Sequence, residues 1–315
     1  MKAGDNLEDK LRKKLIREEL KKKNGGESII LAKYRSKYPE SAEREYIRLI
    51  NEYMSIEKQV FLTFIPELKI IIQEGSTQFQ MDSQKENEKK RKHIRIENSN
   101  IMTKLSAFFD RVKRSLENAF GLFDIKKRIN KIAKLTHKLS MKEWKKTVDK
   151  TLGINLLEDY YSGDVYEDML QRWVSNNVEL IKTIPHSSLG KMKELIYDGY
   201  MSGRTTTNII KDIQTQYGRD KRHATLIARD QTAKLNAEIT QYQQRDAGIE
   251  EYEWSTSGDI RVRDSHKQLN GKIFHWNAPP VVDKRTGRRC HPGEDYQCRC
   301  CALAVFNFDT LDLPV

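Results

Sequence analysis

The sequence has no run of about 18 apolar residues, the length that a membrane-spanning helix needs. Its most apolar segment, residues 60–72, is interrupted by Pro66, Glu67 and Lys69. Residues 1–23 are charged throughout and lack the apolar centre of a secretory signal peptide. We therefore expect a protein that starts in a cytoplasm and has no membrane partner.

Cysteine is also scarce, because only four occur in 315 residues and all lie between Cys290 and Cys301. In a reducing cytoplasm, clustered cysteines more often bind a metal ion or pack as small apolar groups than form disulfides. Three interpretations stay open here: a metal site, a disulfide formed after release into an oxidising environment, and reduced packing.

Apolar residues make up 37% of the chain and charged residues 32%, which is low in apolar content for one compact globule. Extended helices that each bury a single stripe explain such a balance. The length predicts two domains with an extended helical arm. The net charge of +12 and the pI near 9.3 favour polyanionic partners, DNA above all.

Helical periodicity dominates the first 248 residues. We expect a helix over residues 1–23, a helical region over 27–73 that Pro66 breaks or kinks, and amphipathic helices over 101–152 divided near Gly121. Several shorter helices are expected over 155–245. The last of them begins at Arg219 or Asp220 and is closed by Gly248.

After Gly248 the pattern changes to short strands, expected near residues 250–254, 272–276 and 302–308, with long loops between them. The fold class is therefore α+β, with mainly helical N-terminal and central regions and a small β-rich C-terminal module. The expected domains are residues 1–75, a charged linker or exposed helix over 76–100, a central helical domain over 101–248, and the module over 249–315.

Two lysine-rich stretches are candidate DNA contacts, although a solvated helix face would have the same composition. The candidate nucleic-acid-binding residues are Lys89, Lys90, Arg91, Lys92, Lys127, Arg128 and Lys131.

The C-terminal module gathers histidines and cysteines that can bind zinc, and its long loops would gain stability from such an ion. The four predicted ligands are His266, His291, Cys298 and Cys300. A metal-dependent nuclease is an alternative that would use Asp259, Asp264, His266, His291 and Glu294. Against it, Asn270-Gly271 is typical of a turn between strands. A regulatory DNA-binding protein with a zinc-stapled module is a further alternative.

Residues 150–308 resemble the Mu F-like phage head morphogenesis proteins. The resemblance begins in residues 177–185 and continues through Gly203, residues 228–232, Gly248, Tyr252 and residues 254–256. Its C-terminal motif comprises Asp259, Arg263, His266, Gly271, Pro279-Pro280, His291-Pro292-Gly293-Glu294 and Cys298-Arg299-Cys300. The extra Cys301 and the position of Cys290 depart from the pattern.

This resemblance implies a minor head protein of a tailed bacteriophage or prophage, and not an enzyme. Such a protein is present in few copies, associates with the portal protein, and assists head assembly or the handling of DNA. The implied partners are the portal protein, a capsid or scaffolding protein, and double-stranded DNA bound without sequence preference. The implied locations are the host bacterial cytoplasm during assembly and then the virion head.

Overall fold

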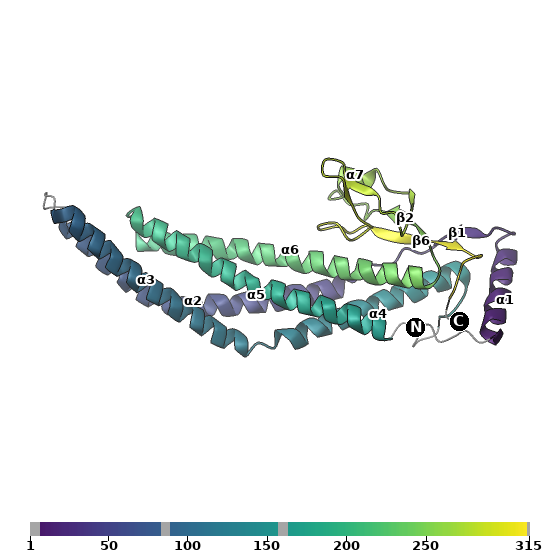
Figure 1. Ribbon diagram of the computed structural model, residues 1–315, viewed down its shortest axis with the longest axis horizontal. Helices are drawn as coiled ribbons and strands as arrows, with labels where there is room; N and C mark the ends of the chain where they lie inside the picture. Colours follow the sequence, from purple (N-terminus) through teal and green to yellow (C-terminus); the bar gives the residue numbers. More distant parts are fainter. Residues whose placement is uncertain (1–6, 83–88, 157–162, 314–315) are drawn as a thin grey trace. The chain divides into compact units, whose positions relative to one another are not determined.

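The computed structural model describes residues 7–82, 89–156 and 163–313, and the side chains of residues 75–100 lie outside this description. Its helices are α1 (Leu7–Lys23), α2 (Glu40–Asp82), α3 (Lys89–Gly121), α4 (Ile125–Leu152), α5 (Asp164–Met201), α6 (Thr206–Asp246) and the short α7 (Asp264–Lys267). Its strands are β1 (Ile29–Leu31), β2 (Glu251–Ser255), β3 (Ile273–His275), β4 (Val281–Asp283), β5 (Arg288–Arg289) and β6 (Cys301–Asn307). The elements are drawn in Figure 1. Long helices followed by short antiparallel strands confirm the predicted α+β class.

Several helix ends coincide with the predicted glycines. The α3 helix ends at Gly121, and Gly203 and Gly248 have φ angles of 66° and 73°, a left-handed conformation that glycine adopts without steric cost. At the end of α6, the N–H of Ile249 donates to the carbonyl of Gln244, so the last turn is closed by backbone hydrogen bonds.

The expectation of several shorter helices over residues 155–245 is wrong. Two long helices occupy this region, and α5 continues through Pro185 just as α2 continues through Pro66. A proline inside a helix removes one backbone hydrogen bond. Buried apolar residues on both sides of Pro185 hold the helix nevertheless, among them Ile181, Ile184 and Met192.

By backbone contacts the chain divides into two compact units, each made of separate stretches of sequence. Unit 1 comprises residues 1–46, 129–175 and 228–315, and unit 2 comprises residues 47–128 and 176–227. The consecutive domains expected from the sequence stay a prediction, because compactness does not show which segments fold or resist proteolysis independently.

Unit 2 is a helical bundle with one apolar core. Its buried residues come from four helices and include Leu68 of α2, Phe108 of α3, Ile196 of α5 and Ile209 of α6. Phe64 and Phe108 meet edge to face, with ring centroids 5.9 Å apart. These residues recur at helical spacing on their own helices, so each helix buries one stripe in the common core.

Unit 1 contains a four-stranded antiparallel sheet in the order β1-β6-β2-β3. The three predicted strands are present as β2, β3 and β6, but β1 was missed because residues 27–73 were expected to be helical. In Figure 1, purple β1 lies beside yellow β6, and Ile30 pairs with Phe306. A segment near the N-terminus therefore completes a sheet made otherwise by the C-terminal module.

The module has a small apolar core of its own on this sheet. Tyr252, Trp254, Trp276, Val282, Cys298 and Cys300 form one buried cluster. Tyr252 and Trp254 alternate along β2 with exposed or half-buried residues, as a strand with one buried face requires. Tyr252 and Trp254 therefore pack the sheet against the loops that carry the two cysteines.

Candidate functional site

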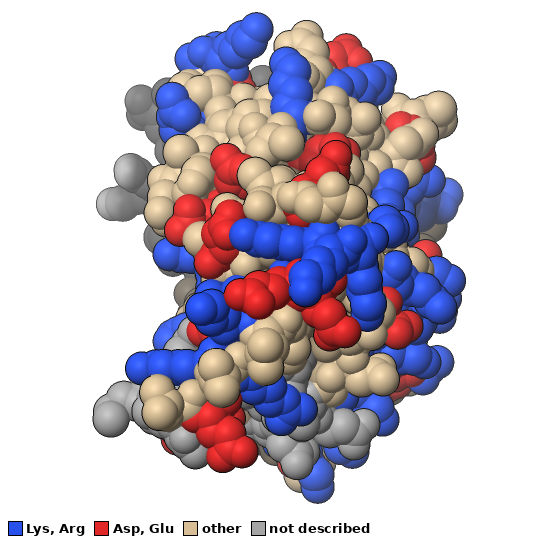
Figure 2. All heavy atoms as spheres, turned by 90° about the vertical axis from the view of Figure 1, so that its right-hand side faces the viewer, with Lys and Arg blue, Asp and Glu red and all other residues tan. Residues whose placement is uncertain are grey.

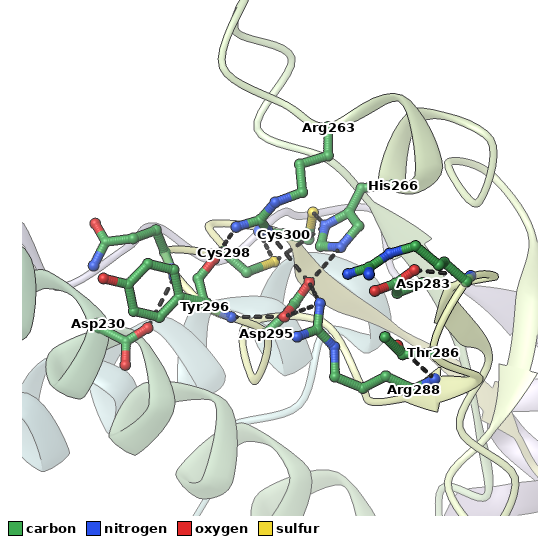
Figure 3. Close-up of polar contacts among 12 residues, drawn as sticks. Asp230, Arg263, His266, Asp283, Thr286, Arg288, Asp295, Tyr296, Cys298 and Cys300 are labelled. Carbon is green, nitrogen blue, oxygen red and sulfur yellow. Dashed lines mark hydrogen bonds and ion pairs between the residues drawn. The ribbon is translucent and has the colours of Figure 1, made fainter.

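The structure brings His266, Cys298 and Cys300 together in the interior of the module. The Nδ1 atom of His266 lies 3.5 Å from the Sγ atom of each cysteine. The three ligand atoms lie within 4.8 Å of one another, and all three residues are buried. Figure 3 shows the imidazole of His266, which comes from α7, facing both sulfur atoms of the loop before β6.

A buried carboxylate lies behind the histidine. Oδ2 of Asp295 is 3.1 Å from Nε2 of His266, and the aspartate side chain is only 2% exposed. Arg263 and Arg288 pair with the same carboxylate at 3.3 Å and 3.0 Å. Two guanidinium groups and one imidazole thus compensate the buried charge of Asp295.

Asp295 is the site residue that sequence reasoning missed. Its neighbour Glu294 was considered instead, but Glu294 accepts a hydrogen bond from the backbone N–H of His291 at 2.6 Å. The sequence did contain a signal for Asp295. It stands three residues before Cys298, in a loop whose buried polar side chains must find hydrogen-bond partners.

The loop before Cys298 is held in place by α6. The buried carboxylate of Asp230 accepts a hydrogen bond from the backbone N–H of Gln297 at 2.8 Å. Gln297 has a φ angle of 54°, a conformation that few residues other than glycine adopt. Gly293 has a φ of 88°, and a Cβ atom there would lie 2.8 Å from Cβ of Ala237 on α6. The close approach of loop and helix therefore requires glycine at this position.

Hydrogen bonding within the cluster separates the acidities of the two thiols. A hydrogen bond with Cys300 lowers the pKa of Cys298 to about 5, and His266 contributes in the same direction while burial opposes it. The pKa of Cys300 is raised by its interaction with Cys298 and by burial. Burial alone would lower the pKa of His266, but its hydrogen bonds with Cys298 and Asp295 raise it. The cluster therefore favours one thiolate at neutral pH.

His291, the fourth predicted ligand, makes other contacts. Its Nδ1 lies 2.8 Å from the hydroxyl of Tyr252, and its ring packs on Trp276 with centroids 4.8 Å apart. Burial lowers the pKa of His291, which favours the neutral ring in this apolar setting. The structure thus gathers three of the four predicted ligands and places His291 in the aromatic core.

The other residues of the sequence motif shape the loops around the cluster. Arg263 binds Asp295 and the carbonyl of Tyr296, and Gly271 donates its N–H to the carbonyl of Trp254. Pro292 is buried, whereas Asp259 and Arg299 are exposed.

The residues of the nuclease hypothesis make separate contacts. Asp259 accepts from the backbone of Arg261, and Asp264 pairs with Lys267 at 2.9 Å. Within residues 7–74, 101–156 and 163–313, the one group of three or more side chains gathered for a metal ion is His266, Cys298 and Cys300.

The predicted nucleic-acid residues fall into two groups. Lys89, Lys90, Arg91 and Lys92 have side chains outside the described part of the structure. Lys127 and Lys131 on α4 are exposed, but Arg128 pairs with Glu52 at 2.6 Å and lies over the ring of Phe123. Arg128 is therefore less free to meet a phosphate than the two lysines.

Within the described residues, no helix is long and apolar enough to cross a membrane. In the described part of unit 1, a small sheet, α7 and the middle of α6 surround a buried histidine–dicysteine cluster. These features define an α+β protein with a buried polar cluster between the loops of its C-terminal module.

Comparison with known proteins finds a family match in the C-terminal half of the chain. Residues 190–303 match the family described as "Phage Mu protein F like protein". The resemblance seen in the sequence is thereby confirmed for these residues, which are similar to the Mu F-like phage proteins. The match includes the last part of α5, all of α6 and the module up to the middle of β6. It indicates a phage head-related protein.

A protein from Haemophilus influenzae that is described as uncharacterized is 35% identical to this chain over 133 residues. The match covers 42% of this chain and 28% of the length of that relative. No solved structure matched the chain.

Proposed function

We propose that this protein is a minor head protein of a tailed bacteriophage or prophage, which associates with the portal vertex and assists head assembly and DNA handling. The observation that carries the proposal is the Mu F-like match over residues 190–303. Its partners are the portal protein, a capsid or scaffolding protein, and double-stranded DNA. It assembles in the host bacterial cytoplasm and stays in the virion head.

The proposed role is structural and includes no catalysis. Asp295, His266 and Cys298 have the chemical types of an activated cysteine nucleophile. However, His266 is 2% exposed and Cys298 is 3% exposed. The cavity beside the two cysteines measures about 20 Å³, which is room for one water and not for a peptide or nucleotide. Burial therefore supports a stabilising role for this cluster.

Non-specific DNA affinity is supported by a lysine stripe on α4. Lys131, Lys134, Lys138 and Lys142 are exposed and recur every three or four residues, so they lie on one face of the helix. On the face drawn in Figure 2, lysine and arginine side chains are interspersed with acidic ones. A single-sign stripe such as that on α4 is therefore the better candidate for phosphate contacts.

The DNA hypothesis is tested by the salt dependence of binding to random-sequence duplexes. Replacing Lys131, Lys134, Lys138 and Lys142 with Gln should reduce the slope of log affinity against log salt by up to about 3.6, since each phosphate contact contributes about 0.9. The matched control replaces four exposed lysines of α1, namely Lys10, Lys14, Lys22 and Lys23. Equal slopes for both variants would show that the α4 stripe does not contact DNA.

The portal hypothesis is tested on proheads of the phage that encodes the chain. Proheads purified from cells that express the intact gene should contain the chain in few copies, and crosslinking should join it to the portal protein. Proheads without the chain, or crosslinks to the major capsid protein alone, would refute the portal association. A copy number near that of the major capsid protein would refute the minor role.

A further inference from the structure

One imidazole nitrogen and two cysteine sulfur atoms, three atoms that commonly bind zinc, lie close together in the interior of the module. We propose that His266 Nδ1, Cys298 Sγ and Cys300 Sγ bind one zinc ion, with water as the fourth ligand and Asp295 as the carboxylate that orients His266. The site is independent of the proposed head function, because it rests on contacts within unit 1 alone.

The first argument is distance. In tetrahedral coordination, with Zn–N near 2.0–2.1 Å and Zn–S near 2.3 Å, nitrogen and sulfur ligands lie about 3.6 Å apart. The two Nδ1–Sγ distances in the structure are both 3.5 Å. One histidine nitrogen therefore lies at the tetrahedral spacing from two sulfur atoms at once.

The second argument is hydrogen-bonding capacity. An ionised carboxylate only accepts, so Asp295 Oδ2, 3.1 Å from Nε2 of His266, places a proton on that nitrogen. When the ring is neutral, Nδ1 then has a single lone pair, so it accepts from one thiol while the two cysteines hydrogen-bond to each other. A bound cation satisfies both sulfur atoms as thiolates together with the Nδ1 lone pair.

The third argument is the support behind the ligands. A histidine that binds zinc commonly donates its other N–H to a carboxylate, which fixes the orientation of the ring. Asp295 provides this contact and is itself held by Arg263 and Arg288. The short helix α7 and the loop before β6 are thereby joined at one buried point.

A small cavity beside the two cysteines has room for solvent. A cavity of about 20 Å³ is lined by Cys298 and Cys300 together with Pro292 and Gly293. This volume exceeds the roughly 10–15 Å³ that one water requires. Three protein ligands and a water satisfy the four positions of a tetrahedral ion.

The proposal assigns no role as ligand to the nearby His291 or Cys301. His291 contacts Tyr252, and Cys301 accepts a hydrogen bond from Arg35 at 3.2 Å. Cys301 pairs with Ser255 at the start of β6, whereas Cys300 directly before it turns into the cluster. Cys301→Ser is therefore a matched control that removes one thiol next to the site without removing a ligand.

The experiment measures metal in the reduced, full-length protein. Elemental analysis after gel filtration should find about one zinc per chain. Cobalt added after chelation should give thiolate-to-metal charge-transfer absorption and the intense visible bands of a tetrahedral ion. Protein grown with zinc that contains none and gives no such spectrum with cobalt would overturn the proposal.

Substitutions then assign the ligands. Cys298→Ser and Cys300→Ser should each weaken zinc binding at least tenfold and reduce the cobalt–thiolate absorption, while Cys301→Ser keeps both. Far-ultraviolet circular dichroism confirms that each variant is folded. Loss of zinc from folded His291→Asn or Cys290→Ser would overturn the assignment of three protein ligands and a water.

Asp295→Asn tests the positioning role. Asparagine keeps an oxygen that can accept from His266 but removes the charge, so zinc affinity should fall about 10- to 100-fold. A competing chelator measures the affinity, and the cobalt spectrum should keep its tetrahedral form because the ligands are unchanged. Unchanged affinity in the folded variant would refute the contribution of Asp295.

Discussion

Glu57 of α2 provides a sharp test of the electrostatics of unit 2. Its side chain is buried, with 1% of the residue exposed, and its neighbours include the hydroxyl of Ser188, which lowers the pKa of Glu57 against the effect of burial. Burial raises the pKa of Glu57 from 4.5 to about 8, and the nearby charge of Asp220 adds to this effect. The carboxyl group is therefore neutral in the folded protein at pH 7 and ionised in the unfolded chain.

The sign of the pH dependence follows from this difference. Between pH 4.5 and about 8 the folded state holds a proton that the unfolded state has lost, so the free energy of unfolding falls as pH rises. Each pKa unit corresponds to about 1.36 kcal/mol, which sets an upper bound of about 5 kcal/mol above pH 8. Relaxation and water entry around the ionised group reduce this cost, and we expect about 3 kcal/mol.

Glu57→Gln removes the titration and keeps the shape of the side chain. Urea unfolding followed by far-ultraviolet circular dichroism should show little change from this substitution at pH 5. At pH 9 the variant should be more stable than the wild type by about 3 kcal/mol. Titrations of groups distant from Glu57 are common to both proteins and cancel in the difference. Tyr53 and Tyr217, which interact with the charge of Glu57, have pKa values of about 12, above this pH range.

The control is Glu194→Gln, which removes a carboxylate from an exposed position on α5 in the same unit. Its stability relative to the wild type should be nearly independent of pH. A Glu57→Gln effect that is equal at pH 5 and pH 9 would refute the reasoning.

Three further predictions concern the backbone, the linker and the cysteines. Gly248→Ala should lower stability by more than Gly258→Ala. Both positions have left-handed φ angles, but only at Gly248 would a Cβ atom meet the carbonyl of Thr310. Chemical denaturation measures both variants, and equal losses of stability would show that the backbone angle alone decides the cost. Limited proteolysis should cut first within residues 74–100, and a resistant fragment that contains this stretch intact would contradict the predicted linker. The double variant Cys298→Ser, Cys300→Ser should melt at a lower temperature than Cys301→Ser, as followed by tryptophan fluorescence, and equal melting temperatures would show that the cysteines do not staple the module.

Local sequence signals were sufficient for the fold class, for the division between α3 and α4, and for the strands β2, β3 and β6. Glycine at positions 121 and 248 has a backbone role that depends on few neighbours, so the ends of two helices could be predicted. The alternation of Tyr252 and Trp254 likewise predicted β2. The expectation that Pro66 could break its helix was not met, and in α5 the cost of Pro185 is offset by apolar burial on both sides, which a local pattern does not reveal.

The pairing of strands that lie far apart in the chain could not be predicted from the sequence. The three residues of β1 are too few for a periodic signal, and they form a strand because the edge of β6 offers hydrogen bonds to them. The three-residue β4 and two-residue β5 were missed for the same reason.

At the candidate site, the sequence by itself determined the residue types: a basic chain, one cluster of histidines and cysteines, and the motif that resembles Mu F-like proteins. The tertiary structure decided which of these residues meet. It joined His266 to Cys298 and Cys300, placed His291 against Tyr252, and brought Asp295 behind the histidine. The physical reason is that spacing along the chain constrains neighbours within a helix or strand, whereas contacts between loops depend on how α6 and the sheet position them.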